Sequence, residues 1–223
     1  MKRVILFDVN ETLLDFHHLD PLFETHFGDA GVLPFWFAQM LQFTFVGVIT
    51  GRHVDFTSAQ RAAVLVLAAR QGVALSTSVV DEIVGAINEL PPHPDVRAGL
   101  EALRAAGYRI GALTNSPPAV VNEQLRRAAL SGHFERILSA EDAGRLKPAA
   151  EAYRYGAAQF GVPTSAVRLV AAHSWDIAGA LAAGCAGAFV SRPGAVPSPL
   201  GEQPDISGPD IVAVARLIIE AER

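Results

Sequence analysis

The fold class of this chain is indicated by residues 4–15, Val-Ile-Leu-Phe-Asp-Val-Asn-Glu-Thr-Leu-Leu-Asp. The apolar run at the start of this stretch ends at Asp8, far short of the roughly 7–15 apolar residues that a signal peptide needs. A short apolar run that ends at turn-forming residues is typical of a buried strand. We therefore predict a buried strand over residues 4–7, with Asp8 at its carboxyl end.

Further short apolar runs follow along the chain, and most of them are separated by stretches of helical periodicity. The runs cover residues 109–113, 136–138, 167–171 and 186–190, with 204–206 as a candidate edge strand. The helices are expected over residues 96–106, 119–130, 176–183 and 211–220. Alternating strands and helices indicate an α/β fold with a mainly parallel sheet.

The stretch between the first strand and the proline cluster at 91–94 has helical periodicity and no clear strand. Its expected helices cover residues 35–48, 58–70 and 78–90. We predict an inserted helical subdomain over residues 15–92, with a core domain formed by residues 1–14 and 93–223. The apolar run 35–50 is short for the roughly 20 residues of a membrane span and carries Gln39 and Gln42, so we interpret it as a helix buried against a partner surface.

Composition narrows the classes of protein to which this chain can belong. The chain has 223 residues, 50% of them hydrophobic and 18% charged, which is enough to bury a substantial core. A single cysteine excludes an intrachain disulfide and makes the cytoplasm the expected compartment. The net charge of −5, without a basic run, argues against a nucleic-acid partner, and we expect no membrane partner either.

Polar residues follow several of the predicted strands. Asp8 ends the first strand, Thr114 and Asn115 end the second, residues 173–176 (His-Ser-Trp-Asp) follow the fourth, and Lys147 precedes a later helix. The carboxyl ends of strands in an open α/β sheet converge on one crevice. Two carboxylates, a hydroxyl, an amide and an ammonium form a coherent set for covalent catalysis by an aspartate that the lysine keeps ionised. For Asp8 alone, a turn or helix cap is the alternative interpretation.

Four stretches carry a family resemblance: FDVNETLLD, LTNS, RLKPAAEAY and AAHSWDIAGA. Over almost its whole length the chain resembles the haloacid dehalogenase superfamily and, within it, the type II 2-haloacid dehalogenases. The resemblance implies a Rossmann-like core with a helical cap inserted after the first motif. It also implies a set of site residues: Asp8 as nucleophile, Thr12 as its hydroxyl partner, Thr114 and Asn115 as contacts of the second motif, Lys147 as the motif lysine, Tyr153 six residues later, and Asp176 as the acid of the fourth motif.

Two departures separate the chain from the phosphatases of this superfamily. Those enzymes usually carry an aspartate two residues after the nucleophile, as general acid, and another near the start of the fourth motif that binds Mg²⁺. Asn10 and Ala172 stand at these positions here. An amide cannot deliver a proton to a leaving alkoxide, and alanine cannot ligate a hard cation. We therefore expect neither a metal nor another cofactor.

The chain also departs from the type II dehalogenases. Phe37 stands where the resemblance calls for a halide-binding arginine, Asn10 replaces a tyrosine, and His173 replaces an asparagine. We expect these three side chains to contribute to the substrate site. His173, oriented by a neighbour such as Asp176, is hypothesised to be the general base for the second half of the reaction. Arg52 and Arg145 are further candidates to bind a substrate carboxylate, with ordinary surface positions as the alternative.

The sequence thus predicts a hydrolase that displaces halide from a small 2-halocarboxylate through an ester on Asp8, giving a 2-hydroxy acid. Two other functions stay open. One is a phosphatase with a degenerate metal site, and the other is a weakly active binding protein on the same scaffold. The apolar helix over residues 35–48 favours core or dimer packing, and we expect a homodimer.

Overall fold

The computed structural model describes residues 2–222. Its strands form one six-stranded sheet in the order β3-β2-β1-β4-β5-β6, and every neighbouring pair is parallel. The strands are β1 (Val4–Phe7), β2 (Ile110–Thr114), β3 (Arg136–Ser139), β4 (Val167–Ala171), β5 (Ala186–Val190) and β6 (Ile206–Gly208). This is the strand order of a doubly wound Rossmann-type sheet. The predicted α/β class with a mainly parallel sheet is confirmed.

Helices cover both faces of the sheet because the strands are apolar on both sides. Ile5 and Phe7 of β1 pack in one cluster with residues of α5 (Val96–Ala105) and α9 (Ile211–Ala221). Val4 and Leu6 pack in another cluster with residues of α7 (Ala150–Gln159) and α8 (Ser174–Ala182). Side chains alternate between the two faces along a strand, so a run of four apolar residues supplies both layers. Helix α6 (Pro118–Arg127) follows β2.

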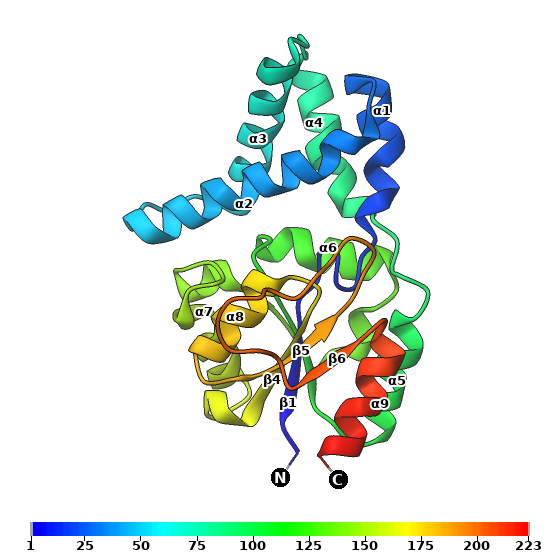
Figure 1. Cartoon of the computed structure of the whole chain (residues 1–223), viewed down its shortest axis with the longest axis vertical. Helices are drawn as coiled ribbons and strands as arrows, with labels where there is room; N and C mark the ends of the chain where they lie inside the picture. The colour runs from blue at the N-terminus through cyan, green and yellow to red at the C-terminus, as the bar shows by residue number, and fades with distance from the viewer. Residues whose placement is uncertain (1, 223) are drawn as a thin grey trace.

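The remaining helices lie between β1 and α5 in the chain and pack together beyond the carboxyl ends of the strands (Figure 1). We call them the cap helices: α1 (Asp20–Phe27), α2 (Leu33–Thr50), α3 (Phe56–Gln71) and α4 (Thr77–Ala86). Asp55 and Ser76 cap the N-termini of α3 and α4, where their side chains accept backbone N–H groups. The division of the chain at residues 14/15 and 92/93 stays a prediction.

Several predicted boundaries differ from the structure by a few residues, and two of these differences have a clear physical reason. The helix expected over residues 78–90 ends as α-helix at Ala86 and continues as a 3₁₀ turn, Ile87–Glu89, before the proline cluster. A 3₁₀ turn commonly tightens the last turn of a helix. The edge strand expected over residues 204–206 begins only at Ile206. Pro204 has no backbone N–H to donate to a neighbouring strand, so the ladder starts after it.

Helix α2 carries the longest apolar run. Within residues 2–222, one helical stretch, Ala30–Thr50, is long and apolar enough to cross a membrane by length and composition alone. Trp36 of α2 is fully buried, and its indole Nε1 donates to the Gln60 carbonyl of α3 over 3.1 Å. Val46 and Ile49, farther along α2, are exposed. Helix α2 is therefore buried against the other cap helices at its start and open to solvent toward its end.

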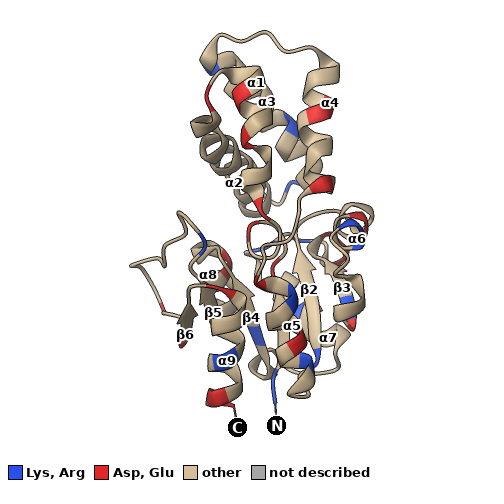
Figure 2. Ribbon diagram, turned by 90° about the vertical axis from the view of Figure 1, so that its right-hand side faces the viewer, with Lys and Arg blue, Asp and Glu red and all other residues tan. Residues whose placement is uncertain are grey.

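Charged residues are distributed over both the cap helices and the helices of the core (Figure 2). Lys, Arg, Asp and Glu lie interspersed along the ribbon. Several pair at the surface, as Arg109 does with Glu135 and Arg127 does with Glu89. Such exposed pairs contribute little to stability. The buried charges are therefore the ones that bear on function.

Candidate active site

Asp8 lies where β1 ends, between the carboxyl ends of its neighbours β2 and β4. Its backbone N–H donates to the Val170 carbonyl over 3.0 Å, and its side chain is buried. The hydroxyl of Thr12 donates to Oδ2 of Asp8 over 2.7 Å, and Oγ1 of Thr12 accepts the N–H of Ala172 over 2.9 Å. The turn after β1 thus closes back on the loop after β4. Strand order reverses between these two strands, which is where open α/β sheets bind ligands.

Lys147 joins the two buried carboxylates. Its Nζ donates to Oδ1 of Asp8 over 2.8 Å, to Oδ2 of Asp176 over 2.6 Å and to the Leu113 carbonyl over 2.9 Å. The lysine side chain is fully buried, as is that of Asp176. An ammonium has three protons to donate, and each of them has an acceptor here. Lys147 therefore works as a fixed positive charge beneath the nucleophile.

Tyr153 supports Asp176 from α7. Its hydroxyl donates to Oδ1 of Asp176 over 2.6 Å, so Lys147 and Tyr153 occupy one oxygen of that carboxylate each. Gly179 of α8 makes room for this contact, because a Cβ there would lie 2.5 Å from the tyrosine hydroxyl. Tyr153 is buried and reaches the site through Asp176. A direct contact between Tyr153 and substrate stays a prediction.

The electrostatics of this cluster follow from burial and from the lysine. Burial alone would raise the pKa of Asp8, but attraction to Lys147 and His173 and hydrogen bonds from Lys147 and Thr12 outweigh it, and the pKa lies below its usual value. Burial also raises the pKa of Asp176, where the charge of Asp8 adds to the effect. Burial would lower the pKa of Lys147, but the two carboxylates raise it. Asp8 is therefore ionised and Lys147 charged at neutral pH.

Asn115 fixes the backbone of Lys147. Its amide Nδ2 donates to the Lys147 carbonyl over 3.0 Å, and its Oδ1 accepts the Lys147 N–H over 2.7 Å. Thr114 makes a local contact, because its Oγ1 accepts the N–H of Ser116 over 3.2 Å. The second motif thus positions the lysine loop. Contacts of Thr114 and Asn115 with substrate stay predictions.

Asn10 is held in a buried amide network. Its Nδ2 donates to Oγ of Ser116 over 3.2 Å, and its Oδ1 accepts from Nε2 of Gln124 over 3.0 Å. The Gln124 amide also donates to the Ile87 carbonyl, which follows α4. Asn10 therefore links the core to the last turn of the cap helices. Its role as a substrate contact stays a prediction.

His173 lies above the nucleophile at the N-terminal end of α8. Its Nε2 is 3.2 Å from the Asn10 carbonyl oxygen, 3.4 Å from Oε2 of Glu11 and 3.7 Å from Oδ2 of Asp8. The expectation that Asp176 orients His173 is wrong, because the Asp176 carboxylate is occupied by Lys147 and Tyr153. The carboxylates that face the imidazole are those of Glu11 and Asp8.

The imidazole of His173 stacks with two aromatic rings. Its centroid is 5.3 Å from that of Phe37, at an interplanar angle of 22°, and 5.3 Å from that of Trp175, at 20°. Phe37 comes from α2 of the cap, and Trp175 comes from the first turn of α8. Phe37 also meets Phe16 edge-on, with centroids 5.3 Å apart. The stack thus connects the cap to the loop after β4 directly over Asp8.

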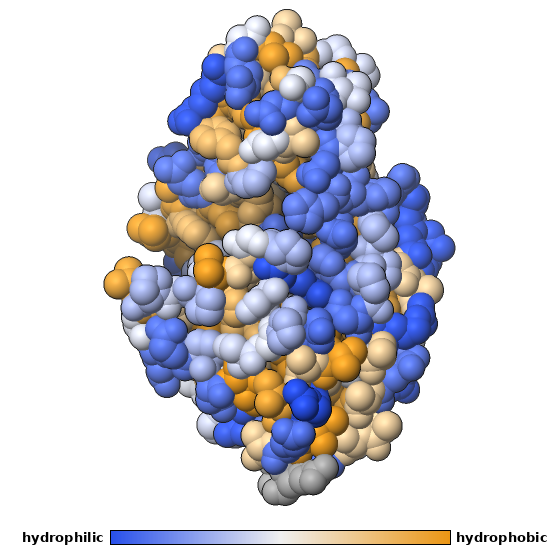
Figure 3. All heavy atoms as spheres, turned by 45° about the vertical axis from the view of Figure 1, so that its right-hand side comes forward, coloured by the Kyte–Doolittle hydropathy of each residue, from blue (hydrophilic) through white to orange (hydrophobic). Residues whose placement is uncertain are grey.

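A cavity of about 560 Å³ opens beside this stack, a size that suits a small-molecule site. Of the residues singled out in the sequence, Phe37, Ala172 and His173 line it, and Asp8 and Lys147 are buried beside them. Other lining residues include Glu11, Phe16, His17, Leu33, Leu41, Trp175 and Arg192. Figure 3 shows apolar surface gathered in the hollow between the cap helices and the core. The cavity is thus mainly apolar with a few charged groups at its wall.

Glu11 is the residue of this site that sequence reasoning missed. It stands between Asn10 and Thr12, lines the cavity, and has a backbone φ of 58°, in the left-handed region that favours glycine. Burial raises the pKa of its carboxyl group. A charged residue inside the first motif was the feature of the sequence that could have pointed to Glu11. Its role could not be inferred without knowing that the Glu11 side chain faces His173.

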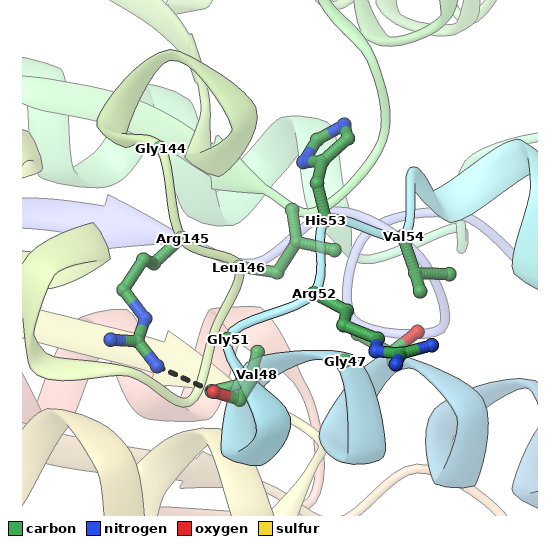
Figure 4. Close-up of a pocket in the computed structure, with 10 residues that line it drawn as sticks. Gly47, Val48, Gly51, Arg52, His53, Val54, Gly144, Arg145 and Leu146 are labelled. Carbon is green, nitrogen blue, oxygen red and sulfur yellow. Dashed lines mark hydrogen bonds between the residues drawn. The ribbon is translucent and has the colours of Figure 1, made fainter.

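Arg52 and Arg145 line a different hollow, where the end of α2 meets the loop before α7 (Figure 4). The Arg145 guanidinium donates to the Val48 carbonyl, and its Nη1 is 3.7 Å from Oε1 of Glu151. The Arg52 side chain points away from Arg145. Neither arginine lines the cavity beside His173. The structure therefore does not bring these two candidate cations to the predicted site. Arg145 instead joins the cap to the core.

Across the described part of the chain, no group of three or more His, Cys, Asp or Glu side chains is placed to hold a metal ion. Ala172 contributes only its backbone N–H, which donates to Thr12. The ammonium of Lys147 lies between the carboxylates of Asp8 and Asp176 and pairs with both of them. A positive charge supplied by the chain itself thus occupies the space between these acids.

The strand order, the cap helices and the buried Asp8–Lys147 pair define an α/β protein with an aspartate poised for nucleophilic attack. The family model of the haloacid dehalogenase-like hydrolases matches residues 2–184, and the chain belongs to this family of enzymes. The predicted superfamily is confirmed.

Among individual proteins, the chain is similar to several dehalogenases. The chain is 27% identical to haloacetate dehalogenase H-2 from Moraxella sp. (strain B) over 222 residues, covering 98% of this chain and 99% of that one. The L-2-haloacid dehalogenase RSc1362 superimposes with a TM-score of 0.92 at 25% identity, covering 97% and 98% of the two chains. An L-2-haloacid dehalogenase from Xanthobacter autotrophicus with chloropropionic acid covalently bound matches with a TM-score of 0.90, covering 98% of each chain; at 22% identity it shows the shared fold.

Proposed function

We propose that this chain hydrolyses the carbon–halogen bond of a small 2-halocarboxylate through an ester on Asp8. The observation that carries the proposal is the buried Asp8 carboxylate, which Lys147 and Thr12 hold over 2.8 Å and 2.7 Å at the switch point of the sheet. The relatives named above are dehalogenases of haloacetate and of L-2-haloacids. The activities of these relatives support the same reaction class for this chain.

In the first half of the reaction, an oxygen of Asp8 attacks C2 of the substrate. The C2–halogen bond breaks, the halide takes the electron pair, and an aspartyl ester forms. Lys147 holds the carboxylate ionised and oriented, which gives the reacting atoms their geometry before the substrate arrives. The halide leaves as a weak base and needs no proton.

In the second half, water attacks Cγ of the Asp8 ester, and the C–O bond between Cγ and the ester oxygen breaks. One water proton ends on the departing oxygen and the other is released to solvent. The 2-hydroxy acid leaves, and the carboxylate is regenerated with one oxygen atom from water. The backbone N–H of Ala172 is engaged by Thr12, so the turn after β1 stays closed on the β4 loop during this step. His173, 3.7 Å from Asp8, is near enough to influence either half of the reaction.

Phosphoryl transfer is the weaker proposal on this site. The Asn10 amide, which stands where a general acid would be needed, is bound by Ser116 and Gln124 and has no acidic proton. Ala172 offers no oxygen ligand from its side chain. A binding protein without activity would not need a buried ion pair, which costs desolvation when both partners leave water.

The test is a halide-release screen with chloroacetate, bromoacetate, fluoroacetate and 2-chloropropionate beside p-nitrophenyl phosphate, each with and without EDTA. We expect halide from at least one haloacid at a rate that EDTA does not change. Mg²⁺-dependent phosphate release without halide would establish the phosphatase alternative. Neither product, from a folded protein that still binds the haloacids, would establish the binding protein.

Repeated turnover in ¹⁸O-water identifies the covalent step. The label is expected in the peptide that contains Asp8, since each hydrolysis returns a water oxygen to the carboxylate. In a single turnover with excess enzyme, the 2-hydroxy acid should carry no label. A labelled product in that first turnover would show direct attack by water and overturn the ester mechanism.

A further inference from the structure

Nε2 of His173 donates a hydrogen bond in this structure. The nearest oxygen, at 3.2 Å, is the Asn10 carbonyl, which can only accept a hydrogen bond. The other two oxygens near Nε2 belong to Glu11 and Asp8, at 3.4 Å and 3.7 Å. All three oxygen atoms near Nε2 are hydrogen-bond acceptors, so Nε2 is the protonated nitrogen of the ring. Nε2 is therefore not available to take a proton from water.

Acidic and aromatic groups surround the His173 ring. Two carboxylates lie within 4 Å of Nε2, those of Glu11 and Asp8, and each attracts a positive charge. Phe37 and Trp175 each stack with the ring, with centroids 5.3 Å from that of the imidazole. Aromatic faces carry negative potential and attract cations. An imidazolium here has oxygen acceptors near Nε2 and two aromatic rings stacked with it.

The cavity has no other unengaged cation among its described lining residues. Arg192 is the single arginine that lines it, and no lysine does. The Arg192 guanidinium is bound to the Thr12 carbonyl over 2.8 Å and 3.1 Å and to Asp95 over 2.7 Å. Phe37, where the resemblance calls for an arginine, is apolar. His17 also lines the cavity, but its Nδ1 is 3.0 Å from Oδ2 of Asp20. Among the described lining residues, His173 is therefore the candidate positive group that stands beside Asp8.

We propose that Glu11 is a positioning residue that holds His173 as an imidazolium, so that the histidine supplies the positive charge absent at Phe37. This rests on the proposed dehalogenase function. Under it, the imidazolium stabilises the substrate carboxylate and the departing halide, and His173 is not the base of the second half-reaction. Each donor removed from such a preorganised site costs on the order of 10²–10³ in rate.

Glu11 is suited to this role by its backbone as well as by its carboxylate. Its backbone has a φ of 58°, and Nε2 of His93 is 3.1 Å from the Glu11 carbonyl oxygen, a contact that holds this backbone in place. The other titratable groups near the Glu11 carboxylate are Asp8, Asp15 and His17. Asp8 and Asp15 repel it and His17 attracts it, so His173 is the only partner in contact with the carboxylate among residues 2–222.

The first test reads the His173 ring directly and needs no substrate. Nitrogen NMR of the histidine rings, with His173→Gln to assign the signal, follows ring protonation against pH in the wild type and in Glu11→Gln. We expect the midpoint to fall by about one pH unit in Glu11→Gln, a tenfold change in the protonation equilibrium. Glu82→Gln is the matched control, because Glu82 pairs with His26, 3.3 Å away on the cap. An unchanged midpoint in Glu11→Gln would overturn the proposal.

The second test separates a charge role from a base role. Rapid-quench measurement of halide in the first turnover reports only the alkylation of Asp8. We expect Glu11→Gln to slow that turnover about tenfold near the wild-type midpoint and His173→Gln to slow it about 10²-fold at every pH. In the wild type this first-turnover rate should fall as the pH rises through the midpoint of the His173 ring. A full burst of halide from His173→Gln, followed by a stall, would make His173 the base and overturn the proposal.

The two proposals fail in different ways. A wild type that releases no halide from any haloacid would remove the proposed function, while the ring titration would still show whether Glu11 controls His173. A wild type that dehalogenates, with neither His173 nor Glu11 affecting the first turnover, would leave the function standing and remove this inference. Circular dichroism of both variants confirms that each is folded.

Discussion

Lys147 is bound to Asp8 over 2.8 Å, and neither side chain is more than 6% exposed. The two residues are 139 positions apart in the chain, and the loop before α7 brings the lysine under the end of β1. In a buried pair the desolvation cost of each charge is offset by its partner. The pair therefore ties the chemistry of the site to the stability of the fold.

Replacement of Lys147 by methionine should lower both activity and stability. Asp8 and Asp176 would be left as buried, unpaired acids, and breaking a buried pair costs about 3–5 kcal/mol. Urea unfolding followed by circular dichroism measures this loss. Arg61→Met is the control, because the exposed Arg61–Asp81 pair should contribute less than about 1 kcal/mol. Equal losses in the two variants would contradict the role given to Lys147.

The stabilising contribution of Asp8 should depend on pH in a defined direction. The pKa of Asp8 in the folded protein lies below its ordinary value of 3.8, so its contribution is present above pH 3.8 and disappears as the pH falls through the lower folded value. In a His173→Gln background, which removes the imidazole 3.7 Å from Asp8, we expect the difference in free energy of unfolding caused by Asp8→Asn to be constant from pH 7 to about pH 5. It should then shrink toward pH 3. A difference that grows on acidification would mean that the folded pKa is raised.

Asn115→Ala should reduce activity because it frees the backbone of Lys147. The variant loses two buried hydrogen bonds, of 2.7 Å and 3.0 Å, and we expect it to lose about 1–3 kcal/mol of stability. Halide release should fall while the secondary structure is retained. Asn122→Ala removes an exposed side-chain contact to the Pro118 carbonyl and should leave both properties near the wild type. Normal turnover by Asn115→Ala would show that the lysine loop is held by other contacts.

Glycine at position 11 should make the protein more stable and less active. Glu11 and Ala129 are the non-glycine residues with positive φ within residues 2–222, at 58° and 53°. Left-handed backbone costs a residue with a Cβ about 1–2 kcal/mol, and part of that is recovered with glycine. Thermal unfolding should therefore show a higher Tm for both Glu11→Gly and Ala129→Gly. Only Glu11→Gly should slow halide release, and a lower Tm for both would show that these turns are not strained.

The sequence alone predicted the strands and their parallel arrangement, and it singled out Asp8 as the candidate nucleophile. Apolar runs such as residues 4–7 carry this information locally, since four buried side chains in a row require cover on both faces. Asp8 and Lys147 could be paired in advance because an attacking carboxylate needs a nearby cation to keep it ionised and oriented. The start of β6 and the end of α4 were predicted less accurately. Where a strand begins after a proline, and where an α-helix continues as a 3₁₀ turn, both depend on the neighbouring segments.

Only the tertiary structure decided which side chains face each other within the site. Asn115 binds the Lys147 backbone, Tyr153 reaches Asp176, and Glu11, not Asp176, meets His173. These contacts depend on side-chain directions set by backbone dihedrals and on how the cap lies over the core. Neither has a periodic signal in the sequence, because a contact between residues on different elements is fixed by the packing of the whole chain. The sequence therefore identified the chemical groups, and the fold determined which of them act on one another.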